Sequence, residues 1–105
     1  MGTDFPIEPS DPWRNIAAAL DRCNEGETAW HAEECLEWPA ILQAYSAAPA
    51  RAAGWRHTGM IVPGNAADMI VVEKDPGEGA PWHQRVCLTM LRGDVVYSDG
   101  SIDLP

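Results

Sequence analysis

The sequence has few basic side chains, and this limits what it can bind. Only 7 Lys and Arg residues accompany 16 Asp and Glu residues, which gives a formal net charge of −9. Binding to nucleic acid or to an anionic membrane surface depends on Lys and Arg side chains that neutralise phosphates. We therefore expect no nucleic acid and no membrane among the partners. The negative charge is typical of a solvated acidic surface.

Cysteine is also scarce. The three residues Cys23, Cys35 and Cys87 are an odd number at wide spacings, which fits neither a disulfide framework nor a zinc-ligand pattern. The sequence lacks the run of about 18 apolar residues that a transmembrane helix needs. It also lacks, at its start, the basic and apolar regions of a signal peptide. These absences together predict a cytoplasmic protein with reduced, partly buried thiols.

Tryptophan is unusually frequent for a chain with so few other aromatic residues. Five Trp accompany a single Phe, within an apolar share of 46% over 105 residues, which is enough for the core of one domain. Trp buries a large area while its N–H requires a partner, so it often marks interfaces. We favour core or interface packing over ligand binding for Trp13, Trp30, Trp38, Trp55 and Trp82.

The first half of the chain has helical patterns. Residues 2–7 read as a short extended segment, which Pro6 ends. An Asp11-Pro12 start and apolar residues at helical spacing predict a helix over about residues 11–23. A second helix is expected from Pro39 to about residue 45, and a short helical turn then ends at Gly54.

The second half has strand patterns. Residues 60–62 form a short β-run, and residues 69–73 and 85–91 read as strands. A tight turn at residues 92–94 predicts a hairpin with residues 95–97. Asp68 is expected to cap the turn before its own strand. We predict an α+β fold, N-terminal helices followed by a small antiparallel sheet, divided at residues 1–54 and 55–105 but packed as one compact unit.

The candidate site residue is Asp4. It lies in an apolar run at the end of the extended segment and before a helix, where a barrel enzyme places a catalytic carboxylate. A second group of possible ligands is His31, Glu33, Glu34 and Cys35. A structural zinc needs four ligands in defined geometry, so we favour a solvated helix surface for this second group.

Four stretches of the sequence carry a resemblance to a known family. They are residues 2–12 (GTDFPIEPSDP), residues 42–54 (LQAYSAAPARAAG), residues 59–72 (GMIVPGNAADMIVV) and residues 89–97 (TMLRGDVVY). In order and spacing they resemble the C-terminal end of the amidohydrolase superfamily, in its family 3 with the formamide-deformylase-like hydrolases. The resemblance covers nearly the whole chain, and its last two stretches are the most specific.

The resemblance implies a (β/α)₈ barrel with an appended β-sandwich and a zinc or other divalent metal centre. In that family an Asp from the last barrel strand orients or deprotonates a metal-bound water, and Asp4 is the matching position. The other metal ligands come from earlier strands. A barrel of this type has about 250 residues, so the resemblance implies that these ligands lie upstream of Met1 and that this chain alone holds no metal cofactor.

Two hypotheses follow. In the first, the chain is the last barrel strand, the C-terminal helices and half of the sandwich of a metal-dependent amidohydrolase that acts on non-peptide C–N bonds. Its partner would be the missing barrel portion, without which it is inactive. In the second, it is a stand-alone, non-catalytic module that self-associates, or binds another protein, through a Trp-rich apolar face. The apolar face of the first predicted helix, which carries Trp13, would pack against the barrel in the first hypothesis. In the second hypothesis another surface would have to cover it.

Overall fold

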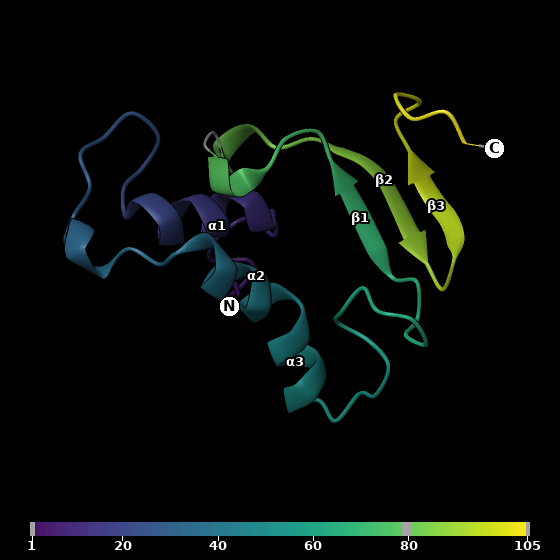
Figure 1. Cartoon of the computed structure of the whole chain (residues 1–105). Coiled ribbons are helices and arrows are strands. Elements are labelled where there is room, and N and C mark those ends of the chain that lie inside the picture. Colours follow the sequence, from purple (N-terminus) through teal and green to yellow (C-terminus); the bar gives the residue numbers. More distant parts are fainter. Residues whose placement is uncertain (1, 79–80, 105) are drawn as a thin grey trace.

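The computed structural model describes residues 2–78 and 81–104. Helices occupy its first half and an antiparallel sheet its second half, so the predicted α+β fold is confirmed (Figure 1). The helices are α1 (Pro12–Asp21), α2 (Trp38–Tyr45) and α3 (Ala47–Ala52), and the strands are β1 (Met69–Val72), β2 (Val86–Leu91) and β3 (Asp94–Ser98). Short 3₁₀ turns lie at Ala32–Glu34, Pro76–Glu78 and Pro81–His83.

Helix α1 forms where its local signals predict it. The side chain of Asp11 accepts a hydrogen bond from the backbone N–H of Trp13 at 3.0 Å, and Pro12 occupies the first turn. Arg22 ends the helix in the left-handed region, with φ 49°, and donates its N–H to the carbonyl of Ala18. The helix packs against the 3₁₀ turn Pro81–His83 and against α2.

Helices α2 and α3 pack on each other, and each supplies one residue of the small core. Ile41 of α2 has no exposed surface, and Ala50 of α3 is buried. Gly54 follows α3 with φ 70°, which confirms the glycine stop that the sequence indicates. The remaining core residues are Ile16, Ala17, Cys87 and Leu88.

The sheet has the strand order β1-β2-β3 with both pairs antiparallel. The predicted hairpin and the strand before it are confirmed. Strand β2 is central and carries the buried residues of the sheet, whereas every residue of β3 is exposed. The register shifts once between β1 and β2 and once between β2 and β3, which is typical of bulges that increase twist.

Two predicted extended segments are absent. Residues 4–7 form a turn instead, closed by a 2.9 Å hydrogen bond from the N–H of Ile7 to the carbonyl of Asp4, and residues 2–3 are irregular. Residues 60–62 are irregular, and Ile61 is 81% exposed. Both segments have apolar composition, but neither pairs with a neighbouring strand, and a strand needs such pairing for its backbone hydrogen bonds.

The fold leaves much surface uncovered. Its radius of gyration is 15.1 Å, against about 13 Å for a compact domain of 100 residues. It exposes 7681 Å², whereas a compact monomer of 11.4 kDa exposes roughly 5,800 Å². Large side chains such as Phe5, Ile7, Trp30, Trp55 and Val96 are more than half exposed.

Candidate functional site

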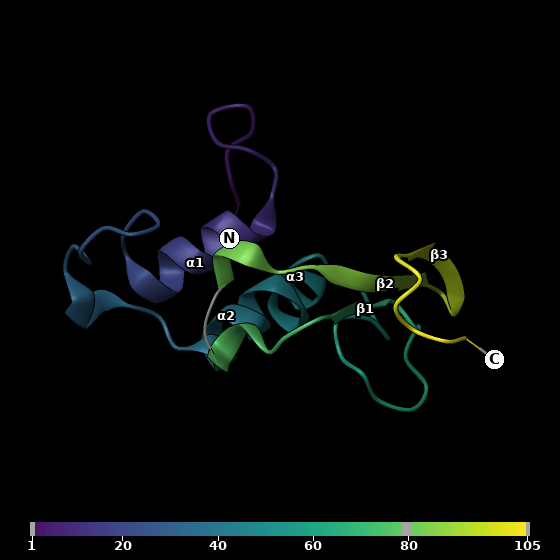
Figure 2. The same ribbon diagram turned by 90° about the horizontal axis from the view of Figure 1, so that it is seen from above.

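Asp4 lies in the loop that precedes α1. Its side chain is exposed, and its backbone has a positive φ of 52°. Asp tolerates this left-handed conformation better than most residues. Figure 2 shows that the loop extends away from α1 and from the other elements. The carboxylate is therefore presented on a projecting turn and not at the end of a strand.

Asp4 has no companion ligands in the described parts of the chain. Within residues 2–78 and 81–104, no group of three or more His, Cys, Asp or Glu side chains is arranged to hold a metal ion. A catalytic zinc site takes three protein ligands and a water molecule. The residues described here therefore do not fit a metal by themselves.

The second group of possible ligands takes part in a surface network around Trp30. The Nδ1 atom of His31 lies 2.7 Å from Oε1 of Glu33, and this hydrogen bond is the largest cause that lowers the pKa of Glu33. Glu34 pairs with Arg22 at 3.3 Å. The guanidinium of Arg22 also lies over the ring of Trp30, 5.1 Å from its centroid, and donates to the Trp30 carbonyl. The carboxylates of Glu33 and Glu34 thus contact different partners.

The fold creates one polar hollow that the sequence does not reveal. It has a volume of about 540 Å³ and is lined by Asp11, Arg14, Asn24, Glu25, Glu27 and Trp82. Its carboxylates take part in local contacts. Oε1 of Glu25 lies 2.6 Å from Nε2 of His83, and Oε2 of Glu27 accepts a hydrogen bond of 2.8 Å from Nδ2 of Asn24. Asp11 caps α1. No motif signals this hollow, because Trp82 comes from a segment more than fifty residues away from the other lining residues, at 11–14 and 24–27.

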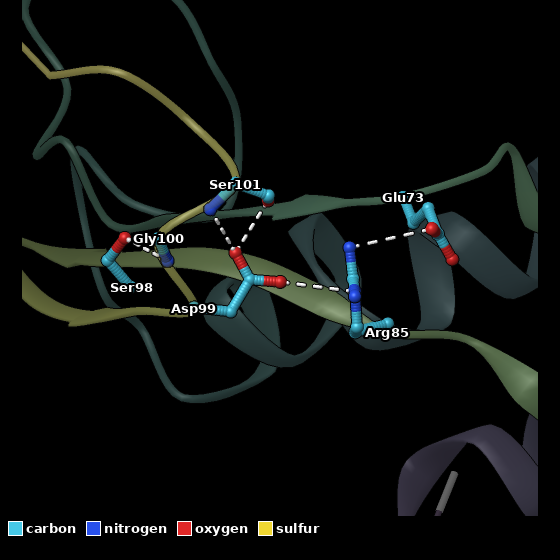
Figure 3. Close-up of polar contacts among 6 residues, drawn as sticks. All are labelled: Glu73, Arg85, Ser98, Asp99, Gly100 and Ser101. Atoms are coloured by element: carbon cyan, nitrogen blue, oxygen red, sulfur yellow. Dashed lines mark hydrogen bonds and ion pairs between the residues drawn. The ribbon is translucent and has the colours of Figure 1, made fainter.

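A polar network at the end of the sheet joins its three strands. Arg85 lies 3.5 Å from Glu73 and 3.1 Å from Oδ2 of Asp99, the latter an ion-pair contact without hydrogen-bond geometry (Figure 3). Oδ1 of Asp99 accepts two hydrogen bonds from Ser101. These bonds, together with the charge of Arg85, hold the pKa of Asp99 below its usual range. Glu73 and Asp99 raise the pKa of Arg85.

Asp68 has a role that differs from the predicted one. Its Oδ1 accepts a hydrogen bond of 2.7 Å from the backbone N–H of Arg92, in the turn between β2 and β3. The carbonyl of Ala67 accepts from the N–H of Gly93 in the same turn. Asp68 therefore does not cap the turn before its own strand. It fastens the hairpin turn that lies 24 residues further along the chain.

Comparison with known families bears on these same stretches. A family model described as "Amidohydrolase family" matches residues 1–97, which include the turn at Asp4, the Asp68 segment and the hairpin. The chain belongs to the amidohydrolase family. No curated protein and no solved structure matches it. No helix among the described residues is long and apolar enough to span a membrane.

Two of the residues that carry the resemblance have structural roles in this member of the amidohydrolase family. Gly59 has φ 78°, and a Cβ atom at this position would lie 2.8 Å from the carbonyl oxygen of Ser46. Only glycine fits between this loop and the end of α2. Asp68 joins β1 to the hairpin turn. The motif over residues 59–72 therefore describes how the loop attaches to the helices and the sheet.

Proposed function

We propose that this chain forms the C-terminal part of a metal-dependent amidohydrolase that hydrolyses non-peptide C–N bonds, in the formamide-deformylase-like branch, and that it is inactive on its own. The observation that carries the proposal is the family match over residues 1–97. In this proposal residues 1–54 supply the C-terminal helices and the segment of the last barrel strand, which forms a turn in the chain alone. Residues 55–105 supply the β-rich part of the sandwich.

The large exposed surface of the chain is an argument for a partner that covers it. The exposed area exceeds that of a compact monomer of the same mass by roughly 1,900 Å². A standard interface buries about 800 Å² on each side, and permanent interfaces bury more. Strand β3 is exposed along its whole length, and β1 and β3 are both edge strands. The remaining part of a barrel and sandwich is a partner of the right size for this surface.

Asp4 would contribute one carboxylate to the active site of the complete enzyme. A zinc or other divalent ion would supply the activated water there, and other residues of the barrel would supply the remaining ligands. The exposed carboxylate of Asp4 accepts no hydrogen bond among the described contacts. It would therefore be available to a metal without the loss of an internal contact. The projecting turn would have to settle against the barrel to deliver it.

Genomic and biochemical measurements test the proposal together. The DNA that precedes the codon for Met1 is expected to encode a barrel with a His-x-His strand in frame, or a separate barrel chain is expected to co-purify. That complex should contain stoichiometric metal and hydrolyse non-peptide C–N bonds, with formamides as the first substrates to be tested. Asp4→Asn should lower kcat by at least about 10²-fold, the usual range for a lost proton-transfer group, with Asp11→Asn as the matched control. The proposal would be refuted if neither a barrel sequence nor a barrel partner is found. It would also be refuted if the isolated chain binds stoichiometric metal.

The exposed apolar surface favours a second candidate function. Trp30 and Trp55 are 68% and 69% exposed, which is costly for an isolated monomer. A stand-alone, non-catalytic module would cover these residues by self-association or by binding another protein. Light scattering after size-exclusion chromatography separates the two functions. A monodisperse, metal-free oligomer of this chain supports the module, whereas a monomer that joins a barrel chain supports the enzyme.

A further inference from the structure

We propose that Cys23 and Cys35 are a redox pair that forms a reversible disulfide across the base of the loop at residues 24–34. The inference does not rest on the proposed function. Both thiols are half-buried and are unbonded in this structure. Cys87, in contrast, is 5% exposed within strand β2.

Backbone hydrogen bonds bring the two ends of the loop together. The N–H of Trp30 donates to the carbonyl of Arg22, the residue just before Cys23, at 2.9 Å. The N–H of Leu36, the residue just after Cys35, donates to the carbonyl of Ala19 at 2.9 Å. The chain therefore leaves the last turn of α1 at Cys23 and returns beside that same turn at Cys35.

Side chains hold the same junction from both directions. Arg22 forms an ion pair at 3.3 Å with Glu34, so each partner of this pair is the chain neighbour of one cysteine. Arg22 also donates from Nε to the carbonyl of Trp30 at 2.9 Å. Burial, followed by the charges of Asp21 and Glu27, raises the pKa of Cys23, and Cys35 adds to that rise. A disulfide requires Cα atoms about 4.4–6.8 Å apart, and the backbone hydrogen bonds at Arg22 and Leu36 hold the segments that carry the two cysteines against the same end of α1.

The chemistry needs an oxidant of the low-molecular-weight disulfide class, such as glutathione disulfide. One cysteine thiolate attacks a sulfur of the oxidant, forms a mixed disulfide and releases one thiolate. The second cysteine, after losing its proton to solvent, attacks the protein sulfur of that mixed disulfide and releases the second small thiol. Two protein thiols are oxidised to one disulfide, and one small disulfide is reduced to two thiols. The product closes the loop and fixes the 3₁₀ turn Ala32–Glu34 to the end of α1.

Glutathione redox titration followed by mass spectrometry tests the pair. Both cysteines lie on the tryptic peptide 23–51 and Cys87 lies on another, so the disulfide appears as a loss of two hydrogens from peptide 23–51. We expect half-oxidation when [GSH]²/[GSSG] is on the order of millimolar, the effective concentration of a short loop. Cys23→Ser and Cys35→Ser should give only the glutathione adduct of the remaining cysteine. Cys87→Ser should titrate like the wild-type chain.

The oxidised chain should also melt at a higher temperature than the reduced chain, by about 5 °C or more, because the closed loop restricts the unfolded state. The proposal is wrong if the wild-type chain accumulates glutathione on both cysteines, or disulfides between chains, at ratios where peptide 23–51 should be half-oxidised. It is also wrong if Cys87→Ser abolishes the loss of two hydrogens. If oxidation leaves the melting temperature of the wild-type chain unchanged, the proposed closure of the loop is refuted.

Discussion

The side chain of Asp68 and the backbone N–H of Arg92 are joined by a hydrogen bond of 2.7 Å. Arg92 and Gly93 both have positive φ, 52° and 89°, in the two-residue loop that connects β2 to β3. Such a loop matches the twist of a hairpin but places a non-glycine residue in a costly conformation. The carboxylate of Asp68 satisfies an N–H in this turn and so offsets part of that cost.

Removal of this carboxylate should loosen the end of the sheet. We expect Asp68→Ala to lower the free energy of unfolding by about 1 kcal/mol, since it leaves the N–H of Arg92 without its partner. Thermal unfolding followed by circular dichroism measures the loss. Asp94→Ala, an exposed aspartate beside the same turn, is the matched control and should change the stability by less than about 0.5 kcal/mol. Equal effects of the two substitutions would contradict the assigned role.

Gly59 should not tolerate a side chain. A Cβ atom there would lie 2.8 Å from the Ser46 carbonyl oxygen and 3.0 Å from the Cβ of Ala50, and φ is 78°. Gly64 has a φ of 91° but open space around it. We expect Gly64→Ala to cost about 1 kcal/mol from the backbone alone and Gly59→Ala about 2–3 kcal/mol because of the added overlap. Denaturant unfolding of the two variants compares them, and similar midpoints would disprove the close approach.

Gly77 lies against the indole ring of Trp38. A Cβ atom on Gly77 would be 2.5 Å from Cδ1 of this ring, which cannot bend away as a flexible side chain can. Gly77→Ala should therefore destabilise the chain by about 1–3 kcal/mol. The double variant Gly77→Ala/Trp38→Leu should lose less than the sum of the two single variants, because the smaller side chain makes room. Additive losses in thermal unfolding would show that the two residues do not meet.

The network around Asp99 should make stability fall in acid. The pKa of Asp99 is lowered in the folded chain, first by the Ser101 hydrogen bonds. Its contribution is therefore present above the unfolded-state pKa of about 3.9 and is lost as the pH falls through the lower, folded-state value. Urea unfolding between pH 2 and pH 7 should show a drop below about pH 4. Asp99→Asn should lessen this drop and be less stable at pH 7, whereas Asp103→Asn should keep the wild-type profile.

The sequence predicts the elements whose signals are local. Helix α1 has its cap, its proline and its apolar stripe within ten residues, and the hairpin has an Arg-Gly loop between an apolar run and the β-branched pair Val95-Val96. These contacts form between near neighbours in the chain. Local chemistry is therefore sufficient to predict them.

Non-local features could not be predicted in this way. Residues 2–7 and 60–62 have the apolar composition of strands, but composition does not say whether another strand lies alongside. The partner of Asp68 lies 24 residues away, and local sequence cannot indicate a turn at that distance. The exposed turn of Asp4 depends on how the loop leaves α1, and the metal role inferred for Asp4 from the family resemblance remains a prediction.

The central position of β2 has a consequence for the order in which the sheet folds. Its connection to β3 is a two-residue loop, so this hairpin can close within microseconds. Its connection to β1 runs from residue 73 to residue 85, and the longer loop has a higher closure entropy. Strand β1 should therefore dock onto a hairpin that already exists. The bond between Asp68 and Arg92 would then be among the last contacts made and the first broken during unfolding.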